Sequence, residues 1–282
     1  MTAFISHLRS WRTLLLCAPL MALAATPEGR SPQPTDDPAA NVIWQKARAS
    51  LFDKRPIAPA PEGLLTLEAP LRAIDAAVVP VAIRTRLPAG AGYTISKLYL
   101  FIDANPSPIS GIFGFTPDSG RAEVETRVRV DGYSYMRAVA ETSDGRLFMT
   151  HRFVKASGGC SAAPGSDPAA ALAAMGQMRV TTDGDLNGKE PVLAQLAIQH
   201  PNHTGLAMDQ LTRQFTPAHF VRKVDVSYGG KPVFSADVDF SMSENPNFRF
   251  YFLPGAGGEL QVKVADSQQR VYTAKHVPRA AP

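Results

Sequence analysis

Residues 121 to 130 read Arg-Ala-Glu-Val-Glu-Thr-Arg-Val-Arg-Val, so that two kinds of side chain alternate along the chain. The apolar set comprises Ala122, Val124, Val128 and Val130. The charged set comprises Arg121, Glu123, Glu125, Arg127 and Arg129. Because successive side chains of a strand point to opposite faces, the stretch predicts a β-strand with one buried face and one face in water.

The same period of two recurs along the chain on both sides of this stretch. In the first half it involves Val79, Val81, Ile83, Leu98, Leu100 and Ile102. In the second half it involves Leu193, Gln195, Ala197, Phe220, Val224, Val226, Tyr228, Phe248, Phe250, Phe252, Leu260, Val262 and Val264. Turn signals separate these stretches, at Asn105-Pro106, 117–120, Asp131-Gly132, Asp144-Gly145 and Gly229-Gly230. The pattern predicts an all-β fold with two immunoglobulin-like β-sandwich domains in tandem, each of about 100 residues.

Two short helices interrupt the β pattern. Asp37 followed by Pro38 is typical of a helix start, and we expect a helix to about Phe52. Its apolar face would contain Trp44, Ala47 and Leu51. Asp167-Pro168 predicts a second, alanine-rich helix that ends near Met178. The predicted organisation is a signal peptide at 1–25, a leader and short helix at 26–62, a first sandwich at 63–160, a linker with the alanine-rich helix at 161–182, and a second sandwich at 183–282.

The N-terminus has the layout of a secretory signal peptide. Arg9 and Arg12 precede the apolar run from Leu14 to Leu23, and small residues follow at Ala24 and Ala25. The apolar run is shorter than the roughly 20 residues that a membrane-spanning helix needs. We therefore expect export to the periplasm without stable membrane insertion.

Composition limits the function classes. The chain has 282 residues with 29 basic and 25 acidic side chains, and the basic residues are scattered instead of forming the stripe typical of nucleic-acid binding. No glycine-rich phosphate loop or paired catalytic carboxylates stand out, so no nucleotide cofactor is expected. His200 and His203 lie three residues apart without a clear third ligand, which favours a polar role at a strand end over metal binding. His219, before Phe220, is expected to be a hydrogen-bonded structural histidine.

Cleavage of the signal peptide would remove Cys17 and leave a single cysteine, Cys160. Structural cysteines in an oxidising compartment normally form pairs, so an unpaired thiol there calls for a function. Cys160 follows Ser157, Gly158 and Gly159 and precedes Ser161. These small residues give the backbone freedom and a narrow cross-section, which suits presentation of the thiol into a partner's cleft. Basic neighbours or the start of the second helix would favour the reactive thiolate.

Several short motifs together resemble a known family. The first half ends in Lys155-Ala156-Ser157-Gly158-Gly159-Cys160, which is similar to SoxY. The second half is similar to SoxZ through His200-Pro201, Thr204-Gly205-Leu206, Pro217-Ala218-His219-Phe220, Gly230-Lys231-Pro232-Val233 and Asn245-Pro246. The chain thus resembles the SoxYZ sulfur carrier, fused into one polypeptide over residues 40 to 278.

This resemblance implies a carrier that is not itself an enzyme and that needs no cofactor or metal. Cys160 would bear sulfur intermediates covalently, on a mobile arm formed by Ser157, Gly158, Gly159 and Ser161. Its partners would be periplasmic enzymes of sulfur oxidation, namely a cytochrome and a hydrolase. One departure is that the family cysteine lies almost at a chain end, whereas here a whole domain follows Cys160. Fused carriers of this kind resemble those associated with quinoprotein alcohol dehydrogenases, so a dehydrogenase partner and a different cargo are also possible.

Two function classes remain open from the sequence. In the first, Cys160 carries a covalent sulfur-containing or electrophilic cargo, and the exposed thiols of two chains can join as a Cys160-linked homodimer. In the second, the chain is a tandem immunoglobulin-like binding module that docks a periplasmic dehydrogenase or cytochrome without covalent cargo. A one-cysteine peroxidase or thiol reductase is disfavoured, since the mature chain has no resolving cysteine and no thioredoxin-like pattern.

Overall fold

The computed structural model describes residues 33, 36–186, 189–209, 212–255 and 257–278. The predicted signal peptide and most of the predicted leader lie outside these residues. All described residues belong to one compact unit, Ser31–Pro282. Within the described residues, neither helix is long and apolar enough to cross a membrane.

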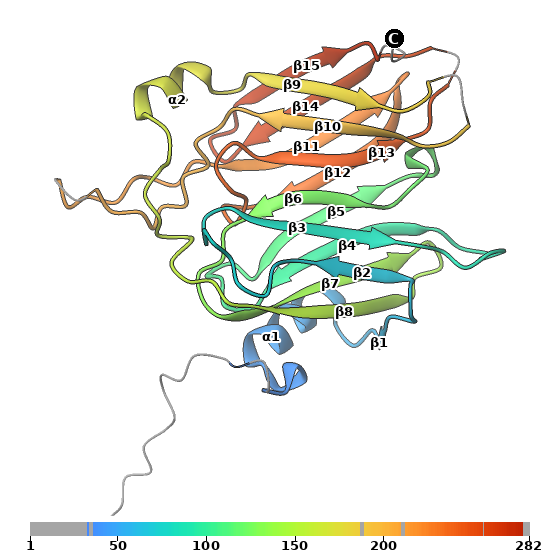
Figure 1. The fold of residues 1–282 in the computed structure, drawn as a ribbon, viewed down its shortest axis with the longest axis horizontal. Coiled ribbons are helices and arrows are strands. Elements are labelled where there is room, and N and C mark those ends of the chain that lie inside the picture. Colours follow the sequence, from blue (N-terminus) through green and yellow to red (C-terminus); the bar gives the residue numbers. More distant parts are fainter. Residues whose placement is uncertain (1–32, 34–35, 187–188, 210–211, 256, 279–282) are drawn as a thin grey trace, which may run out of the picture. The chain divides into compact units, whose positions relative to one another are not determined.

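The unit is built from two open β-sheets (Figure 1), which confirms the prediction of an all-β fold. The nine-stranded sheet has the order β1-β8-β7-β4-β5-β12-β11-β14-β15, and the six-stranded sheet has the order β2-β3-β6-β13-β10-β9. The strands of the first half are β1 (Ile57–Pro59), β2 (Leu65–Glu68), β3 (Val79–Thr85), β4 (Ile95–Ile102), β5 (Ile109–Phe115), β6 (Val124–Val128), β7 (Ser134–Thr142) and β8 (Leu147–Val154). Those of the second half are β9 (Met178–Asp183), β10 (Val192–Ile198), β11 (Val221–Tyr228), β12 (Lys231–Val238), β13 (Asn247–Phe252), β14 (Leu260–Asp266) and β15 (Val271–His276).

Both sheets run through both halves of the chain. In the nine-stranded sheet β5 pairs antiparallel with β12, from Phe115 opposite Phe234 to Gly111 opposite Val238. In the six-stranded sheet β6 meets β13 through the pair Glu125 and Arg249. The two predicted sandwiches therefore join edge to edge as well as through the linker, while the boundaries assigned to them stay a prediction.

One core lies between the sheets and extends across the junction. Phe113 of β5 stacks on Phe234 of β12 with ring centroids 6.3 Å apart, and Phe234 stacks on Phe250 of β13 at 4.4 Å. The alternating phenylalanines of β13 are all buried, as the period of two predicted. Each fully buried phenylalanine contributes about 1.5–3 kcal/mol, so the phenylalanines of β13 stabilise the fold.

The register of β11 differs from the prediction at its first residue. Val224, Val226 and Tyr228 are buried as expected, but Val221 is buried in place of Phe220. A β-bulge between Val221 and Lys223, in the pairing with β14, inserts a residue and shifts the alternation.

The first helix is divided in two. Asp37 caps a short 3₁₀ turn, η1 (Pro38–Ala40), and Asn41 then caps α1 (Val42–Phe52) by accepting a hydrogen bond from the Trp44 amide at 2.9 Å. The single predicted helix is broken because the extended backbone of Asn41 lies between the two. Trp44 and Ala47 of the predicted apolar face are buried against the nine-stranded sheet. Phe52 joins them, while Leu51 is only partly buried.

A buried ion pair fixes this helical segment to the sheet. Arg137 of β7 donates from Nε to Asp103 at 2.9 Å and from Nη2 to the Pro38 carbonyl at 2.7 Å. Its guanidinium also lies 4.7 Å from the ring centroid of Trp44. The segment is thereby held against the outer face of β4 and β7.

The linker helix is shorter than predicted. α2 (Pro168–Ala174) is capped by Asp167 as expected, but Met175 has an extended backbone with ψ of 130°. The residues near Met178 that were predicted to end the helix begin strand β9 instead.

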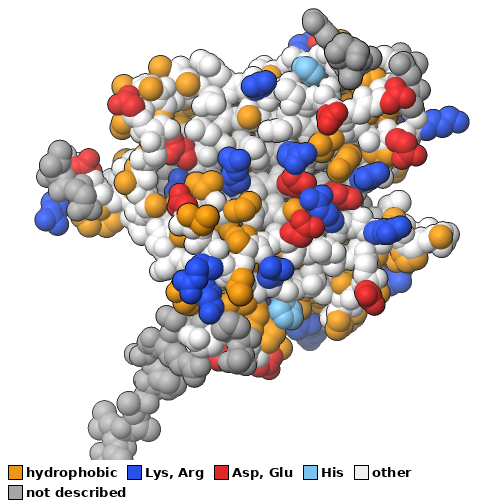
Figure 2. Space-filling model, viewed as in Figure 1, with side chains coloured by type: hydrophobic (Ala, Val, Ile, Leu, Met, Phe, Trp, Pro, Cys, Tyr) orange, Lys and Arg blue, Asp and Glu red, His pale blue; other side chains and the backbone are white. Residues whose placement is uncertain are grey.

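Figure 2 shows basic and acidic side chains intermixed on one face of the molecule. On the six-stranded sheet, Arg84 contacts Glu68 at 3.0 Å and Glu125 at 2.9 Å, and Arg249 contacts Glu125 at 2.6 Å. Arg84 and Arg249 of this sheet are therefore paired with carboxylates.

Candidate functional site

Cys160 lies in the loop that follows β8. We call residues 155–161 the arm. Its start is fixed by the edge of the first half, where the Lys155 amide donates to the Leu71 carbonyl at 2.8 Å and the Ala73 amide donates to the Lys155 carbonyl at 3.1 Å. The arm is therefore fixed at Lys155, directly after the end of β8.

The glycines of the arm are docked onto the backbone that leaves β6. The amide of Gly158 donates to the Asp131 carbonyl at 2.9 Å, and the amide of Gly159 donates to the Val130 carbonyl at 2.9 Å. Gly158 has a φ of 80°, a region that glycine enters without strain. Each such hydrogen bond has a net value of about 1 kcal/mol, so docking rests on several modest contacts.

Gly159 is also required by space. A Cβ atom at this position would lie 2.1 Å from the carbonyl oxygen of Ala76 and 2.7 Å from that of Val130. Only a residue without a side chain fits so close to two backbone strands. Gly159 thus has a packing role in addition to the flexibility expected from the sequence.

The thiol is buried in this arrangement, whereas the sequence led us to expect a presented thiol. Cys160 has 0% exposure, and its carbonyl oxygen accepts a hydrogen bond from Thr204 Oγ1 at 2.6 Å. Burial and the nearby Asp131 raise the pKa of the thiol to about 12, although Arg129 acts in the opposite direction. The thiol is buried because the second half of the chain covers the tip of the arm. The sequence of the arm itself contains no sign of this contact. In this conformation the thiol is neutral and shielded from solvent.

Arg129 is the charged residue next to the tip, and its position differs from the prediction. The alternation placed Arg129 on the wet face of the strand, but β6 ends at Val128 and Arg129 is 4% exposed. Its Nη1 donates to the Gly159 carbonyl at 3.3 Å, and its Nε has no hydrogen-bond partner. Burial lowers the pKa of Arg129 despite the neighbouring anionic groups. Burying a guanidinium with so few hydrogen bonds costs free energy, and such an unpartnered buried charge is unusual in a folded protein.

The chain is fixed again beyond the cysteine. The Gly165 amide donates to Glu244 Oε2 at 2.8 Å, and the Ser166 hydroxyl donates to Glu244 Oε1. Cys160 therefore lies midway between the two fixed points, Lys155 and Gly165. Ser157 is exposed, and its hydroxyl lies 3.5 Å from the Asp131 carbonyl, at the limit of hydrogen bonding. The Ser161 hydroxyl donates to the Gly158 carbonyl at 3.3 Å.

A scan against protein-family models found two matches on the chain. Residues 48–160 match SoxY, described as sulfur oxidation protein SoxY, and residues 180–277 match SoxZ, described as sulphur oxidation protein SoxZ. The SoxY match ends at Cys160 itself. The chain belongs to the SoxYZ family. It carries the SoxY and SoxZ domains in one polypeptide, and proteins of these two families are sulfur carriers rather than catalytic enzymes.

Among solved structures, the SoxY sulfur carrier protein of Chlorobium limicola f thiosulfatophilum is similar to the SoxY domain. It is 27% identical with a TM-score of 0.34, over 40% of this chain and 94% of that one. A superoxide reductase (neelaredoxin) from Ignicoccus hospitalis matches at 17% identity and a TM-score of 0.29, over 39% of this chain and 90% of that one. A search of curated proteins gave no match.

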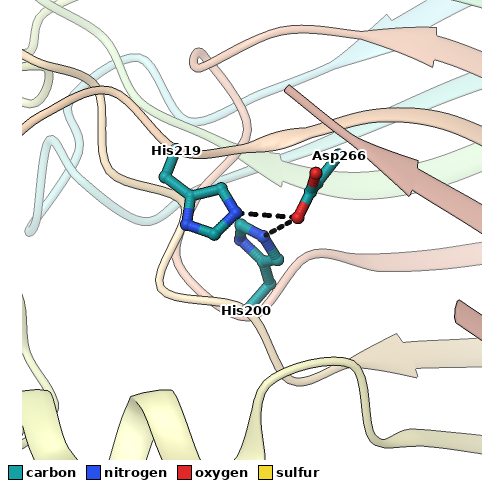
Figure 3. Close-up of side chains that lie close together, drawn as sticks. All are labelled: His200, His219 and Asp266. Atoms are coloured by element: carbon teal, nitrogen blue, oxygen red, sulfur yellow. Dashed lines mark hydrogen bonds and ion pairs between the residues drawn. The ribbon is translucent and has the colours of Figure 1, made fainter. Parts of the chain in front are cut away.

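The SoxZ domain contains a second cluster of functional groups, made of His200, His219 and Asp266 (Figure 3). His219 Nε2 lies 2.7 Å from Asp266 Oδ2, and His200 Nε2 lies 3.7 Å from the same oxygen. All three residues are buried. Burial acts to raise the pKa of Asp266, but hydrogen bonds from His219 and from the amides of Arg270 and Gln268 outweigh it and lower the pKa.

The protonation of His200 argues against a metal centre in this cluster. The Asn202 amide donates to His200 Nδ1 at 3.1 Å, so the neutral ring carries its proton on Nε2. Burial and the neighbouring His219 lower the pKa of His200 to about 4, which keeps the ring neutral near neutral pH. Nε2 lies 3.7 Å from Asp266 without a hydrogen bond, and because it carries the proton it has no lone pair to offer a metal. The geometry favours the structural roles expected for His200 and His219.

Sequence reasoning did not identify Arg129, Thr204 or Glu244 as part of the site. Thr204 appeared only within a SoxZ-like motif, and Glu244 had no distinguishing pattern. Thr204 and Glu244 reach the arm through contacts between the two domains, and Thr204 lies 44 positions after Cys160 in the chain. The sequence pattern of the arm alone therefore could not predict that Thr204 and Glu244 contact it.

Proposed function

We propose that this SoxYZ protein carries a small sulfur-containing substrate covalently on Cys160 and presents it to partner enzymes. The observation that carries the proposal is that the SoxY match ends at Cys160, directly after Gly159, where backbone atoms leave no room for a side chain. Within the described residues Cys160 is also a free cysteine without a disulfide partner. Reversible covalent chemistry is thus available at the tip of the arm.

Thiosulfate illustrates the chemistry that such a carrier supports. A bond forms between the Cys160 sulfur and the terminal sulfur of thiosulfate, with the loss of one proton and two electrons. A partner cytochrome accepts the electrons, and the product is an anionic thiosulfonate joined to the arm by a disulfide bond. A hydrolase partner then adds water and releases sulfate and a proton, which leaves a persulfide on Cys160. Carriers that serve a quinoprotein dehydrogenase would bring a different cargo to the same sulfur.

We place this cycle in the periplasm, on the basis of the signal-peptide pattern at residues 1–25. Cell fractionation of the native host tests the location, and recovery of the protein in the cytoplasm alone would contradict it. A Cys160-linked homodimer belongs to the same proposal, since two undocked arms can oxidise against each other. A non-reducing gel after mild oxidation should show the dimer, and Cys160→Ser should abolish it.

The experiment for the carrier function combines intact mass with growth of the host. Protein isolated during oxidation of the host's substrate should contain adducts that reduction removes, and Cys160→Ser should lack both the adducts and the supported growth. A uniformly unmodified thiol in the isolated protein would overturn the proposal.

The burial of Cys160 specifically favours a second candidate, a binding module that docks a dehydrogenase or cytochrome without covalent cargo. The same variant separates the two functions. If Cys160→Ser supports growth as well as the unaltered protein does, the module binds its partner without using the sulfur.

A further inference from the structure

Both domains contribute contacts to the arm, and we call the surroundings formed by Arg129, Val130, Asp131 and Thr204 the groove. On the SoxY side its contacts are the carbonyl oxygens of Val130 and Asp131, and on the SoxZ side the contact is the hydroxyl of Thr204. The guanidinium of Arg129 completes the set through the carbonyl of Gly159. Four hydrogen bonds therefore hold three consecutive residues, 158 to 160, in one place.

The groove has no room beyond the atoms that occupy it now. The ideal Cβ position at Gly159 overlaps the backbone of Ala76, and Cys160 has 0% exposure. Protein interiors are close-packed, so atoms added to the buried sulfur must displace protein atoms. A cargo on Cys160 and the docked position of the arm compete for the same space.

The charges around the tip favour a neutral Cys160 sulfur over a negatively charged one. Asp131 and Asp239 act against negative charge on the Cys160 sulfur, and burial adds to their effect. Arg129 is the nearby cation that favours negative charge on the sulfur. Its Nε has no hydrogen-bond partner, so the docked state leaves part of its guanidinium without a hydrogen bond. Opening the groove would return Arg129 to water, which limits how firmly the arm is held.

We propose that this groove is a binding site for the unloaded arm, and that an arm carrying an anionic sulfur adduct leaves it. The inference rests on the proposed carrier function and adds its regulation: the empty thiol is shielded, and the loaded sulfur is presented. A partner that consumes cargo then meets loaded arms in preference to empty ones. A shielded thiol is also protected from the oxidants that threaten a free cysteine outside the cytosol.

Chemically loaded protein tests this without any partner enzyme. The Cys160 thiolate displaces thiosulfate from tetrathionate, since a new bond to a central sulfur forms as the central sulfur–sulfur bond breaks. The product is the anionic thiosulfonate, and no further oxidant is needed. Methyl methanethiosulfonate gives a small neutral methyl disulfide instead, with methanesulfinate leaving. The two adducts separate the effect of charge from that of size.

Hydrogen exchange of the Gly158 and Gly159 amides reports docking, because both amides donate within the groove. We expect protection in the free-thiol form and exchange at least about tenfold faster in the thiosulfonate form, with the methyl disulfide between them. Unchanged protection in the thiosulfonate form would overturn the proposal. Equal loss of protection in both adducts would overturn its charge component. Because the adducts are made in vitro, neither result depends on whether Cys160 carries sulfur in the cell.

Thr204 provides a second test in the free-thiol protein. Thr204→Val removes the bond to Cys160 and should raise the rate of thiol modification about fivefold, the factor that corresponds to a hydrogen bond of about 1 kcal/mol. Thr204→Ser should restore the slow rate. Thr85→Val is the matched control, because it removes a comparable bond, to the Ala122 carbonyl at 2.9 Å, away from the arm. A Thr204→Val rate equal to that of the control would contradict the role of the groove.

Discussion

Thr204 of the SoxZ domain donates a hydrogen bond to the carbonyl oxygen of Cys160 in the SoxY arm, at a distance of 2.6 Å. The same Thr204 oxygen accepts a hydrogen bond from the Leu206 amide at 3.0 Å, which fixes the hydroxyl from its own side. The arm is therefore held by a residue that is itself held in place. In a fused chain, this contact joins the tip of one domain to a loop of the other without a separate binding event.

Gly159→Ala should expose the thiol by forcing the arm out of the groove. Its new Cβ would overlap the Ala76 carbonyl, and backbone atoms cannot move aside as a flexible side chain can. We expect thiol modification to be about tenfold faster or more, since loss of docking removes several hydrogen bonds of about 1 kcal/mol each. Timed alkylation followed by mass spectrometry measures the rate.

Gly92→Ala is the control for this substitution, because nothing lies within 4 Å of its ideal Cβ position. Its modification rate should match that of the unaltered protein. If Gly159→Ala behaves like Gly92→Ala, the arm does not dock as the structure shows.

The pH dependence of alkylation should distinguish docked from undocked arms. Docking raises the pKa of the Cys160 thiol from 9.0 to about 12, so it favours the protonated thiol. The stability of the docked state is therefore complete below about pH 9 and declines as the pH rises toward 12. Alkylation of the unaltered protein should keep accelerating toward pH 12, whereas the rate for Gly159→Ala should be half-maximal near pH 9 and level off above it. A midpoint near pH 9 in both proteins would contradict a docked, neutral thiol.

The alternation that predicts the core fails at Arg129 for a physical reason. Phe248, Phe250 and Phe252 lie within one regular strand, so a local period of two was sufficient to predict their burial. Arg129 follows the last residue of β6, where the period no longer sets the direction of the side chain. The arm returns to Arg129 30 residues later, where the Gly159 carbonyl accepts a hydrogen bond from its guanidinium.

The pairing of strands between the two domains also could not be predicted from the sequence. Each half shows its own strands, but the pairing of β5 with β12 is chosen by the fit of two edges that lie far apart in the chain. The Cys160 arm could be put forward as a candidate site from the sequence because its glycines and lone thiol are adjacent. Its docking could not, because Thr204 and Glu244 belong to the other domain.

Glu244→Ala should release the far end of the Cys160 loop. Cys160 lies five positions along the chain from each fixed point, so the thiol can reach no more than about 17 Å from either one. Loss of Glu244 moves the second fixed point further along the chain and lengthens this reach. The Gly165 amide, which donates to Glu244, should exchange several-fold faster, while Gly158 and Gly159 keep their protection.

Glu259→Ala serves as the matched control, since Glu259 forms a surface ion pair with Lys275 at 3.0 Å away from the loop. It should leave exchange at Gly165 unchanged. Equal exchange in the two variants would mean that Glu244 does not hold the loop.

His200 should make the protein less stable in acid. Burial lowers the pKa of His200 from 6.5 to about 4, so the folded state favours the neutral ring. The stability gained from the neutral ring is present above pH 6.5 and is lost as the pH falls from 6.5 toward 4. Between pH 7 and pH 5 this amounts to about 2 kcal/mol of unfolding free energy. Urea denaturation of His200→Gln at both pH values should show a flatter dependence, and an unchanged dependence would assign the acid sensitivity to other groups.

The most direct test of the central claim is peptide mass spectrometry of the protein taken from its host during substrate oxidation. The peptide that contains Gly158, Gly159 and Cys160 should carry a sulfur-containing mass on Cys160, and treatment with a reductant should remove it. A substrate-starved culture should yield the same peptide with a free thiol. An unmodified Cys160 under both conditions, in a host that is oxidising its substrate, would contradict the carrier function.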